Sequence, residues 1–338
     1  MIRLRDFFKR NKTVLQTEQK ISSNEGIKYA YILLSSNSVS FCHYTNNNDY
    51  KLMPLEVLTR GLIFCSENKI DVIIVYPNET IPNEYTEVIN KYKHTSVCDI
   101  TEAGKCQDSC DALVINNFDD LKHISIYHSK KYILRTTKEL LFAHWQKIPI
   151  NISSKLEIVL TDVQSFSKED LLQHHCIMAN LADKCTNNYK NDSNLPINTL
   201  TKRIFLNQMN NCDAINKHIT LAPDGNWYVC PGFYFSQMKP IGSLENPIDI
   251  KNKHLYEIKY APICRNCDAF QCKRCIWLNK LTTLEVNTPS HEQCVIAHNE
   301  RNASRQLLIQ LQENGVLLDK NIKEIHYLDP FEVRSQWI

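Results

Sequence analysis

Short apolar runs alternate with stretches of helical periodicity along the first two hundred residues of the chain. Runs with the length and content of buried strands lie at 29–34, 71–76, 94–100, 112–115, 132–135 and 156–160. Segments of helical spacing follow at 54–63, 83–92, 119–124, 138–147 and 168–181, the last with Ser167 as its N-cap. Residues 38–44 are expected to continue the first strand or to pair with it. This alternation predicts a parallel sheet with right-handed crossovers, open or curled into part of a barrel.

The pattern changes after about residue 205. Two short apolar runs, at 219–221 and 227–229, flank the sequence Ala-Pro-Asp-Gly-Asn, which is a hairpin turn signal. Cysteine-containing loops with short helices near Leu255 and Trp277 follow, and then a terminal helix at 302–314. We therefore predict a lead-in at 1–28, an α/β domain at 29–205, a small cysteine-rich domain at 206–300, and a C-terminal helix and tail at 301–338.

Composition and charge exclude several classes of protein. The chain has 338 residues, 43% of them hydrophobic and 22% charged, with a formal net charge of +2. Such a chain has no strong basic field for nucleic acid, and no apolar run reaches membrane-spanning length. The seven glycines form no phosphate-binding loop of the Rossmann or P-loop type. With no secretory signal at the N-terminus, we expect a cytoplasmic protein whose clustered cysteines are ligands rather than disulfides.

Half of the fourteen cysteines fall in the last two-fifths of the chain. At their centre are two C-x-x-C pairs, Cys264 with Cys267 and Cys272 with Cys275, separated by four residues. A C-x-x-C pair lets two thiolates reach one metal from a tight turn, and thiolates favour zinc or iron–sulfur clusters. The sequence therefore predicts a metal-binding region. Its cysteines are Cys212, Cys230, Cys264, Cys267, Cys272, Cys275 and Cys294.

The order of these cysteines resembles that of the SPASM domain, the auxiliary-cluster domain at the C-terminus of many radical SAM peptide-modifying enzymes. The family pattern is a cysteine, a hairpin ending in G-x4-C, then C-x2-C-x5-C-x3-C and a last cysteine. Here each of the last two gaps in the central motif is one residue shorter.

The SPASM resemblance implies one or two [4Fe–4S] clusters. The first would be held by Cys264, Cys267, Cys272 and Cys294, and the second in part by Cys212, Cys230 and Cys275. The fourth ligand of the second cluster is not evident: a bound substrate, His218 or a distant cysteine are the alternatives. Zinc is the alternative metal, because paired C-x-x-C turns also build zinc ribbons.

Radical SAM enzymes carry C-x3-C-x2-C after the first barrel strand, and this chain does not. Ser35 and Val39 occupy the places of the first two cysteines, and Cys42 alone occupies the third. The resemblance therefore implies a partial (β/α) barrel similar to a degenerate radical SAM domain, followed by a small SPASM-like metal domain. Three thiolates are needed to hold the cluster that binds S-adenosylmethionine, so S-adenosylmethionine is not expected as a cofactor.

The chain as a whole resembles the CXXX-repeat peptide maturases, which are SPASM-domain proteins of ribosomal-peptide modification systems. The segments that carry this resemblance are 38–44, 75–77, 82–85 and 291–305. It implies maturation of a cysteine-repeat peptide, with a cysteine-rich precursor peptide and a companion radical SAM enzyme as partners. The alternative is a non-catalytic adaptor, stabilised by zinc or a cluster, that binds peptide and enzyme. Catalytic and substrate-binding residues are not identified.

Other cysteines and histidines are expected to be structural. Cys65 and Cys98 lie in apolar contexts and are interpreted as small hydrophobic residues. Cys106 and Cys110 lie in a polar loop, where they bind metal or a peptide thiol only in a less favoured interpretation. Cys176 is interpreted as a buried cysteine, and four histidines are interpreted as surface residues: His174, His175, His291 and His298.

Overall fold

The computed structural model describes residues 26–47, 49–103, 110–126, 131–152, 154–192 and 195–316. Its central feature is a sheet with the strand order β6-β5-β4-β3-β2-β1-β7-β8-β9. The first six strands in sequence are all parallel to their neighbours. They are β1 (Tyr29–Leu33), β2 (Asp71–Val75), β3 (His94–Asp99), β4 (Ala112–Ile115), β5 (Lys131–Thr136) and β6 (Lys155–Leu160).

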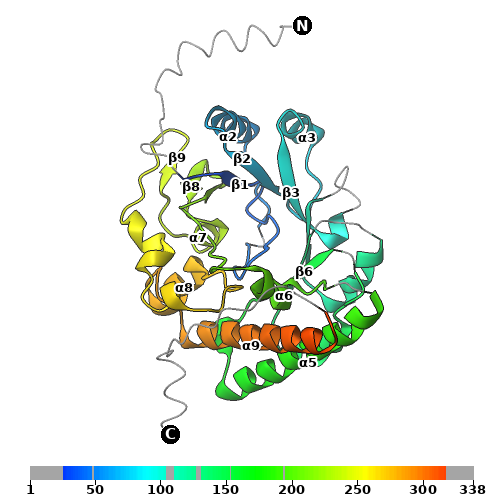
Figure 1. The fold of residues 1–338 in the computed structure, drawn as a ribbon. Helices are drawn as coiled ribbons and strands as arrows, with labels where there is room; N and C mark the ends of the chain where they lie inside the picture. The colour runs from blue at the N-terminus through cyan, green and yellow to red at the C-terminus, as the bar shows by residue number, and fades with distance from the viewer. Residues whose placement is uncertain are drawn as a thin grey trace.

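Helices connect these strands, as the alternation of the sequence predicts. They are α2 (Leu55–Glu67), α3 (Asn83–Ile89), η1 (Ile100–Glu102), η2 (Phe118–Ser125), α4 (Lys138–His144), η3 (Trp145–Lys147), η4 (Val163–Ser165), α5 (Lys168–Asp192) and α6 (Asn198–Phe205). Figure 1 shows the sheet curving around the middle of the molecule, with α2 and α3 at one end and α5 at the other. The predicted α/β partial barrel is therefore confirmed.

A hairpin from the cysteine-rich half of the chain extends the same sheet. Strand β7 (His218–Leu221) pairs in parallel with β1, with Tyr29 opposite His218. Strands β8 (Asn226–Tyr228) and β9 (Gly242–Ser243) then add in antiparallel order. The hairpin turn contains Gly225 at a φ of 80°, a left-handed conformation that glycine adopts without steric cost. The cysteine-rich region is thus joined to the barrel through its sheet.

The rest of the C-terminal half is made of short helices, loops and one long helix. The elements are α7 (Pro231–Phe235), η5 (Lys253–Tyr256), η6 (Ile258–Tyr260), η7 (Cys264–Asn266), α8 (Ile276–Thr283) and α9 (His291–Glu313). Helix α9 packs along α5, where the Asn299 side-chain amide donates to the carbonyl of Leu171 at 2.9 Å. Thr186 donates to Gln310 Oε1 at 2.7 Å near the other end of this contact.

Two expectations about the elements are wrong, and one helix was missed. Residues 38–44 form no strand, because Ser38 directs its hydroxyl to the carbonyl of Val75 at 2.9 Å within a loop of buried polar side chains. The terminal helix begins at His291 instead of 302, after an N-cap at Ser290 whose hydroxyl accepts from the Gln293 amide at 3.2 Å. Helix α6 was not predicted. Residues 1–25 of the predicted lead-in lie outside the described residues.

None of the helices in the described part of the chain combines the length and the hydropathy that a membrane crossing requires.

The packing of α9 predicts a large difference between two neighbouring aliphatic residues. Leu307 has no exposed surface, whereas Ile309 on the same helix is 43% exposed. Leu307→Ala removes buried methyl groups and leaves a cavity, so it should lower the free energy of unfolding by about 2–5 kcal/mol. Ile309→Ala is the matched control and should change it by about 0.5 kcal/mol. Urea denaturation of both variants measures this, and equal effects would contradict the packing of α9 described above.

Candidate metal centre

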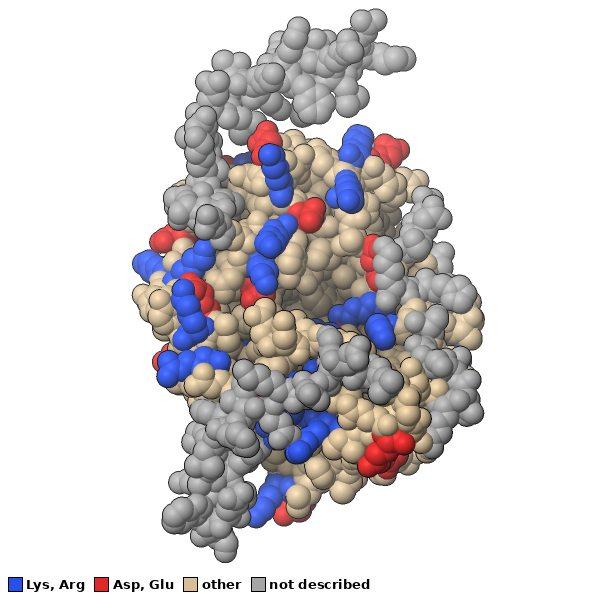
Figure 2. Space-filling model, in the orientation of Figure 1, with Lys and Arg blue, Asp and Glu red and all other residues tan. Residues whose placement is uncertain are grey.

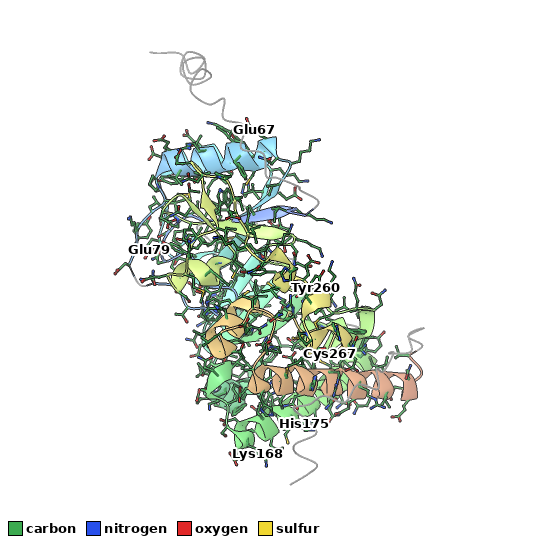
Figure 3. The ribbon with its side chains drawn as sticks, turned by 90° about the vertical axis from the view of Figure 1, so that its left-hand side faces the viewer. Glu67, Glu79, Lys168, His175, Tyr260 and Cys267 are labelled. Atoms are coloured by element: carbon green, nitrogen blue, oxygen red, sulfur yellow. A yellow bond between two sulfur atoms is a disulfide. The ribbon has the colours of Figure 1, made fainter. Side chains whose placement is uncertain are left out.

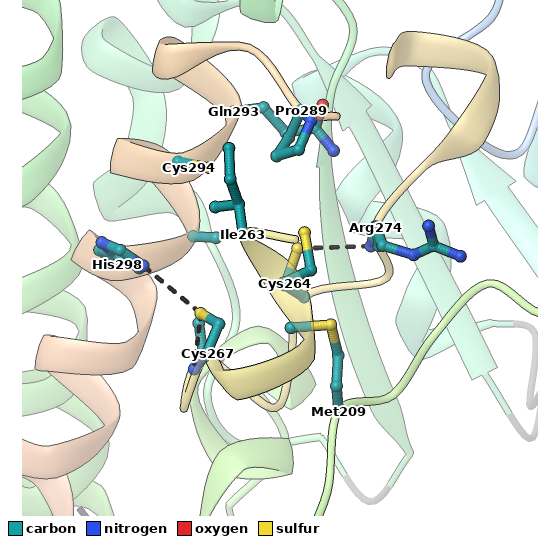
Figure 4. Close-up of a pocket in the computed structure, with 12 residues that line it drawn as sticks. Met209, Ile263, Cys264, Cys267, Arg274, Pro289, Gln293, Cys294 and His298 are labelled. Carbon is teal, nitrogen blue, oxygen red and sulfur yellow. Dashed lines mark hydrogen bonds between the residues drawn. The ribbon is translucent and has the colours of Figure 1, made fainter. Parts of the chain in front are cut away.

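Four of the predicted ligands line one pocket. Cys264 begins η7, Cys267 follows it, Cys272 lies in the next loop, and Cys294 is in the first turn of α9. Figure 4 shows this pocket, which has about 350 Å³ of empty space and includes Met209 and His298 in its wall. The structure thus brings together cysteines that are up to thirty residues apart, and their metal binding stays a prediction.

Hydrogen-bond donors surround the sulfur atoms of this pocket. The amide of Ala269 donates to Cys267 Sγ at 3.4 Å, and the amide of Arg274 donates to Cys272 Sγ at 3.3 Å. The Nε2 atom of His298 lies 3.5 Å from Cys267 Sγ. Such donors stabilise a thiolate or a cluster sulfur. Burial raises the pKa of Cys272, so its thiolate form requires compensation of the kind that a bound metal supplies.

His298 is therefore a site residue that was interpreted as a surface histidine. It is 4% exposed, and its side chain extends from α9 into the pocket. Figure 3 shows Cys267 next to α9. Its four-residue spacing from Cys294 places both residues on one face of the helix, which is the sequence signal for it. His291 is exposed, as expected.

The loop between Cys267 and Cys272 is anchored by buried charge. Asp268 accepts from Arg301 Nη1 at 2.9 Å and lies 3.7 Å from Arg203 Nη2. Arg203 is 1% exposed and its guanidinium lies 4.1 Å from the centre of the Phe270 ring. A buried arginine needs such partners, because desolvation of its charge is costly. These contacts hold the pocket's loop against α6 and α9.

A second and larger pocket adjoins the first and contains the remaining predicted ligands in part. It has about 980 Å³ of empty space, and its walls include Cys212, Cys275 and, unexpectedly, Cys42. Cys230 and Cys275 are the N-cap residues of α7 and α8. Burial, with a smaller contribution from Cys42, raises the pKa of Cys212 to about 11.

His218, one of the alternatives for the fourth ligand, has a different partner. Its ring stacks on Tyr29 with 5.1 Å between ring centres, and its Nδ1 atom lies 3.2 Å from the tyrosine hydroxyl. It is 4% exposed, and burial lowers its pKa to about 4. The imidazole is therefore neutral and hydrogen-bonded inside the barrel.

The loop at the place of the radical SAM motif is filled with hydrogen-bonded polar side chains. Ser35 donates to Asn37 Oδ1 at 2.8 Å, and the Asn37 amide donates to Glu79 Oε2 at 2.7 Å. Asn46 donates to the carbonyl of Asn37 at 2.8 Å. Ser35 is completely buried, so these bonds satisfy polar atoms that have no access to water.

Charged side chains occupy the second pocket together with the cysteines. Glu157 accepts from Lys131 at 2.7 Å, from Lys202 at 3.2 Å and from Lys273. Burial alone would raise the pKa of Glu157, but these three lysines hold it well below its usual range. Glu300 accepts from Gln271 Nε2 at 3.4 Å, and burial raises its pKa to about 8. Sequence reasoning missed this group because its members are scattered over five elements and segments. Figure 2 shows a central hollow on this face of the molecule, with basic side chains at its rim.

Two expectations about cysteines and histidines are corrected. Cys98 is joined to Cys110 by a disulfide, so it is not a free hydrophobic residue. On α5 the order is the reverse of that expected: Cys176 is exposed, whereas His174 is 1% exposed and burial lowers its pKa to about 3. The face of α5 that packs on α9 includes His174, which lies 3.4 Å from Asn299 Nδ2. Cys106 lies outside the described residues.

Within the described ranges, no three His, Cys, Asp or Glu side chains form a group that could hold a metal ion as the side chains stand. The cysteines of both pockets are therefore brought near one another without converging on a single point.

Neither a protein-family model nor a curated protein sequence matches the chain. Among solved structures, it is similar to native anSMEcpe with bound AdoMet and Cp18Cys peptide, with a TM-score of 0.59, 12% identity, and coverage of 86% of this chain and 99% of that one. Streptococcus suis SuiB bound to S-adenosylmethionine gives a TM-score of 0.46 at 11% identity, over 87% of this chain and 81% of that one.

At 12% identity the similarity to anSMEcpe shows a shared fold, and the SuiB score is too low to support an inference. The chain thus shares a partial-barrel fold with anSMEcpe, as the sequence predicts. The expectation that S-adenosylmethionine does not bind is not confirmed, because this fold neighbour is solved with it bound.

Glu300 gives a pH-dependent prediction. Its pKa rises from 4.5 to about 8 on folding, so between these pH values the native state holds a proton that the unfolded state has lost. Stability therefore falls as pH rises from about 4.5 to about 8. Glu300→Gln should lose this component and gain stability relative to the wild type at pH 8 but not at pH 4.5. Thermal unfolding across this range measures it, with the exposed Glu285→Gln as control. Parallel pH profiles for Glu300→Gln and the wild type would contradict it.

Proposed function

We propose that this chain is a peptide-maturation protein with a [4Fe–4S] cluster on Cys264, Cys267, Cys272 and Cys294. In this proposal it acts on a cysteine-rich precursor peptide of the CXXX-repeat kind, together with a companion radical SAM enzyme. The observation that supports it most is that these four thiols line one pocket in a chain that shares the fold of anSMEcpe, which is solved with a peptide bound.

The chemistry of the first pocket suits a cluster with no open iron. A [4Fe–4S] cluster takes one cysteine thiolate on each of its irons, so four protein ligands leave no place for substrate. Its contribution would be electron transfer and stabilisation of the fold. The amides of Ala269 and Arg274 and the ring of His298 would set its potential through contacts with sulfur.

The loop after β1 supports the proposal that a second enzyme supplies part of the chemistry. It supplies Cys42 alone, and the buried hydroxyl of Ser35 is already bonded to Asn37. One thiol cannot hold the three-cysteine cluster on which S-adenosylmethionine is reductively cleaved, so that chemistry would come from the companion enzyme.

The same loop favours a second candidate function, that of a non-catalytic adaptor. In this alternative a zinc ion or a cluster stabilises the C-terminal half, and the chain only brings peptide and enzyme together. The two functions differ in whether the bound metal accepts and returns electrons.

Metal analysis tests the first part of the proposal. After strictly anaerobic purification the protein should contain iron and show the broad visible absorption of a cluster that reductant bleaches. Cys267→Ala should lose this cluster's iron and lower the stability of the C-terminal half, because a region so poor in regular elements is stabilised by its metal. Cys176→Ala, on the exposed face of α5, should keep both iron and fold. Stoichiometric zinc without iron would overturn the cluster and favour the adaptor.

Peptide binding tests the second part. The precursor peptide encoded beside the gene should bind the anaerobically purified protein, as measured by calorimetry, and the companion enzyme should bind it too. If a peptide thiolate enters an open position of the second cluster, Cys→Ser changes in the peptide should weaken binding and alter the cluster spectrum. If a protein ligand closes that position, the same changes should leave the spectrum unaltered. Absence of binding to both partners would overturn the proposed function.

A further inference from the structure

The loop that contains Cys42 is held in place on both sides of the cysteine. Arg135 donates from Nε to the carbonyl of Cys42 at 2.8 Å and from Nη2 to the carbonyl of Tyr44 at 2.6 Å. Between them, His43 Nδ1 lies 2.6 Å from the carbonyl of Leu160. Figure 1 shows the loop after β1 running into the middle of the molecule. The backbone at Cys42 therefore has a fixed position inside the barrel.

Aromatic contacts connect this loop to the helices that begin at two of the predicted ligands. The ring of Tyr44 stacks on Phe235 at 5.3 Å and meets Trp277 edge-on at 6.5 Å. Phe235 lies in α7, whose N-cap is Cys230, and Trp277 lies in the first turn of α8, whose N-cap is Cys275. The residue two positions after Cys42 thus sits between the two helices that carry these cysteines.

The other members of the group are close to one another as well. A Cβ atom added at Gly232 would lie 2.6 Å from Trp277 Cγ, so α7 and α8 are in tight contact next to Cys230 and Cys275. The amide of Cys212 donates to the carbonyl of Lys273 at 2.6 Å, which ties Cys212 to the segment that ends at Cys275. Cys42, Cys212 and Cys275 then line one and the same pocket.

From this arrangement we propose that Cys42 is the fourth protein ligand of a second [4Fe–4S] cluster, whose other ligands are Cys212, Cys230 and Cys275. The inference deepens the proposed function and rests on it for the identity of the metal. Each thiolate takes one iron of the cluster, so all four irons have protein ligands. A peptide thiolate then has no position on this cluster, and the precursor peptide binds elsewhere. The cluster also joins the barrel to the cysteine-rich half, because its ligands come from both.

Iron content and electron paramagnetic resonance of the reduced protein test the assignment without an activity assay. Wild type reconstituted under anaerobic conditions should hold about eight irons per chain, four for each cluster. Cys42→Ala and Cys212→Ala should each lose about half of the iron and the same resonance signal. Cys267→Ala should lose the other signal, and Cys65→Ala, a buried cysteine of α2, should lose neither.

Two further variants keep the result interpretable. Cys42→Asp places an oxygen ligand at the same position and should restore iron with a shifted signal, which a purely structural role for Cys42 would not produce. The double variant of Cys42 and Cys212 to Ala should lose no more iron than either single variant, because both act on one cluster.

The outcomes separate this inference from the proposed function. Wild type with both signals whose Cys42→Ala variant keeps both overturns the assignment of Cys42 alone. Wild type with a single signal that depends on Cys267 also overturns it, and leaves the proposed function standing. Wild type that binds no iron under these conditions overturns both.

Discussion

The parallel pairing of β7 with β1 is the constraint on which the rest of the structure depends. Tyr29 lies opposite His218, so segments that are almost 190 residues apart in sequence become neighbours in one sheet. The hydrogen bonds of this pair place the hairpin and the short helix α7 beside the interior of the barrel. Without it the cysteine-rich half would have no fixed position relative to the loop after β1.

A second packing interaction completes that arrangement. The ring of Phe41 packs on Tyr31 of β1 at 4.9 Å, and Tyr31 in turn meets His218 of β7 edge-on at 5.2 Å. The loop after β1 therefore folds back over the inner face of the sheet instead of leaving it at the strand end. This brings Cys42 toward the side on which β7 begins and Cys212 lies. Aromatic contacts of this kind contribute stability beyond their buried area and also fix orientation.

The sequence predicted the parallel strands well and the polar loop and long helix poorly. Strand β2 was found because its apolar run is buried on both faces and has no competing signal. Residues 38–44 contain Val39, Phe41 and Tyr44, which suggested a strand, but Ser38 and its neighbours bond to the backbone and prevent a ladder. In α9 the polar residues His298 and Asn299 are buried, and each has a specific hydrogen-bond partner. Because the buried face of the first turns contains polar residues, the apolar periodicity of the sequence did not predict them.

The candidate site shows the same division between local and distant information. The C-x-x-C spacing predicted the first pocket, because most of its cysteines are close in sequence and a turn is enough to bring them together. The place of Cys42 beside Cys212 and Cys275 has no local signal, because it follows from strand pairing and from rings that meet only in the folded chain. Tertiary contacts determine the position of such a residue, and a spacing motif in the sequence gives no information about those contacts.

The loop after β1 is held by hydrogen bonds of its own polar side chains. The hydroxyl of Ser35 donates to Asn37 Oδ1, the Asn37 amide donates to Glu79, and the hydroxyl of Ser38 donates to the carbonyl of Val75. Buried polar atoms are costly to leave without partners, so a cysteine at the position of Ser35 would remove the donor to Asn37 Oδ1 and weaken this network. The loop that leads to Cys42 therefore contains a network in which Ser35 stands where the radical SAM motif would have its first cysteine. In this chain the barrel loop contributes one thiol, Cys42, to a pocket that is also lined by Cys212, Cys272 and Cys275 of the cysteine-rich half.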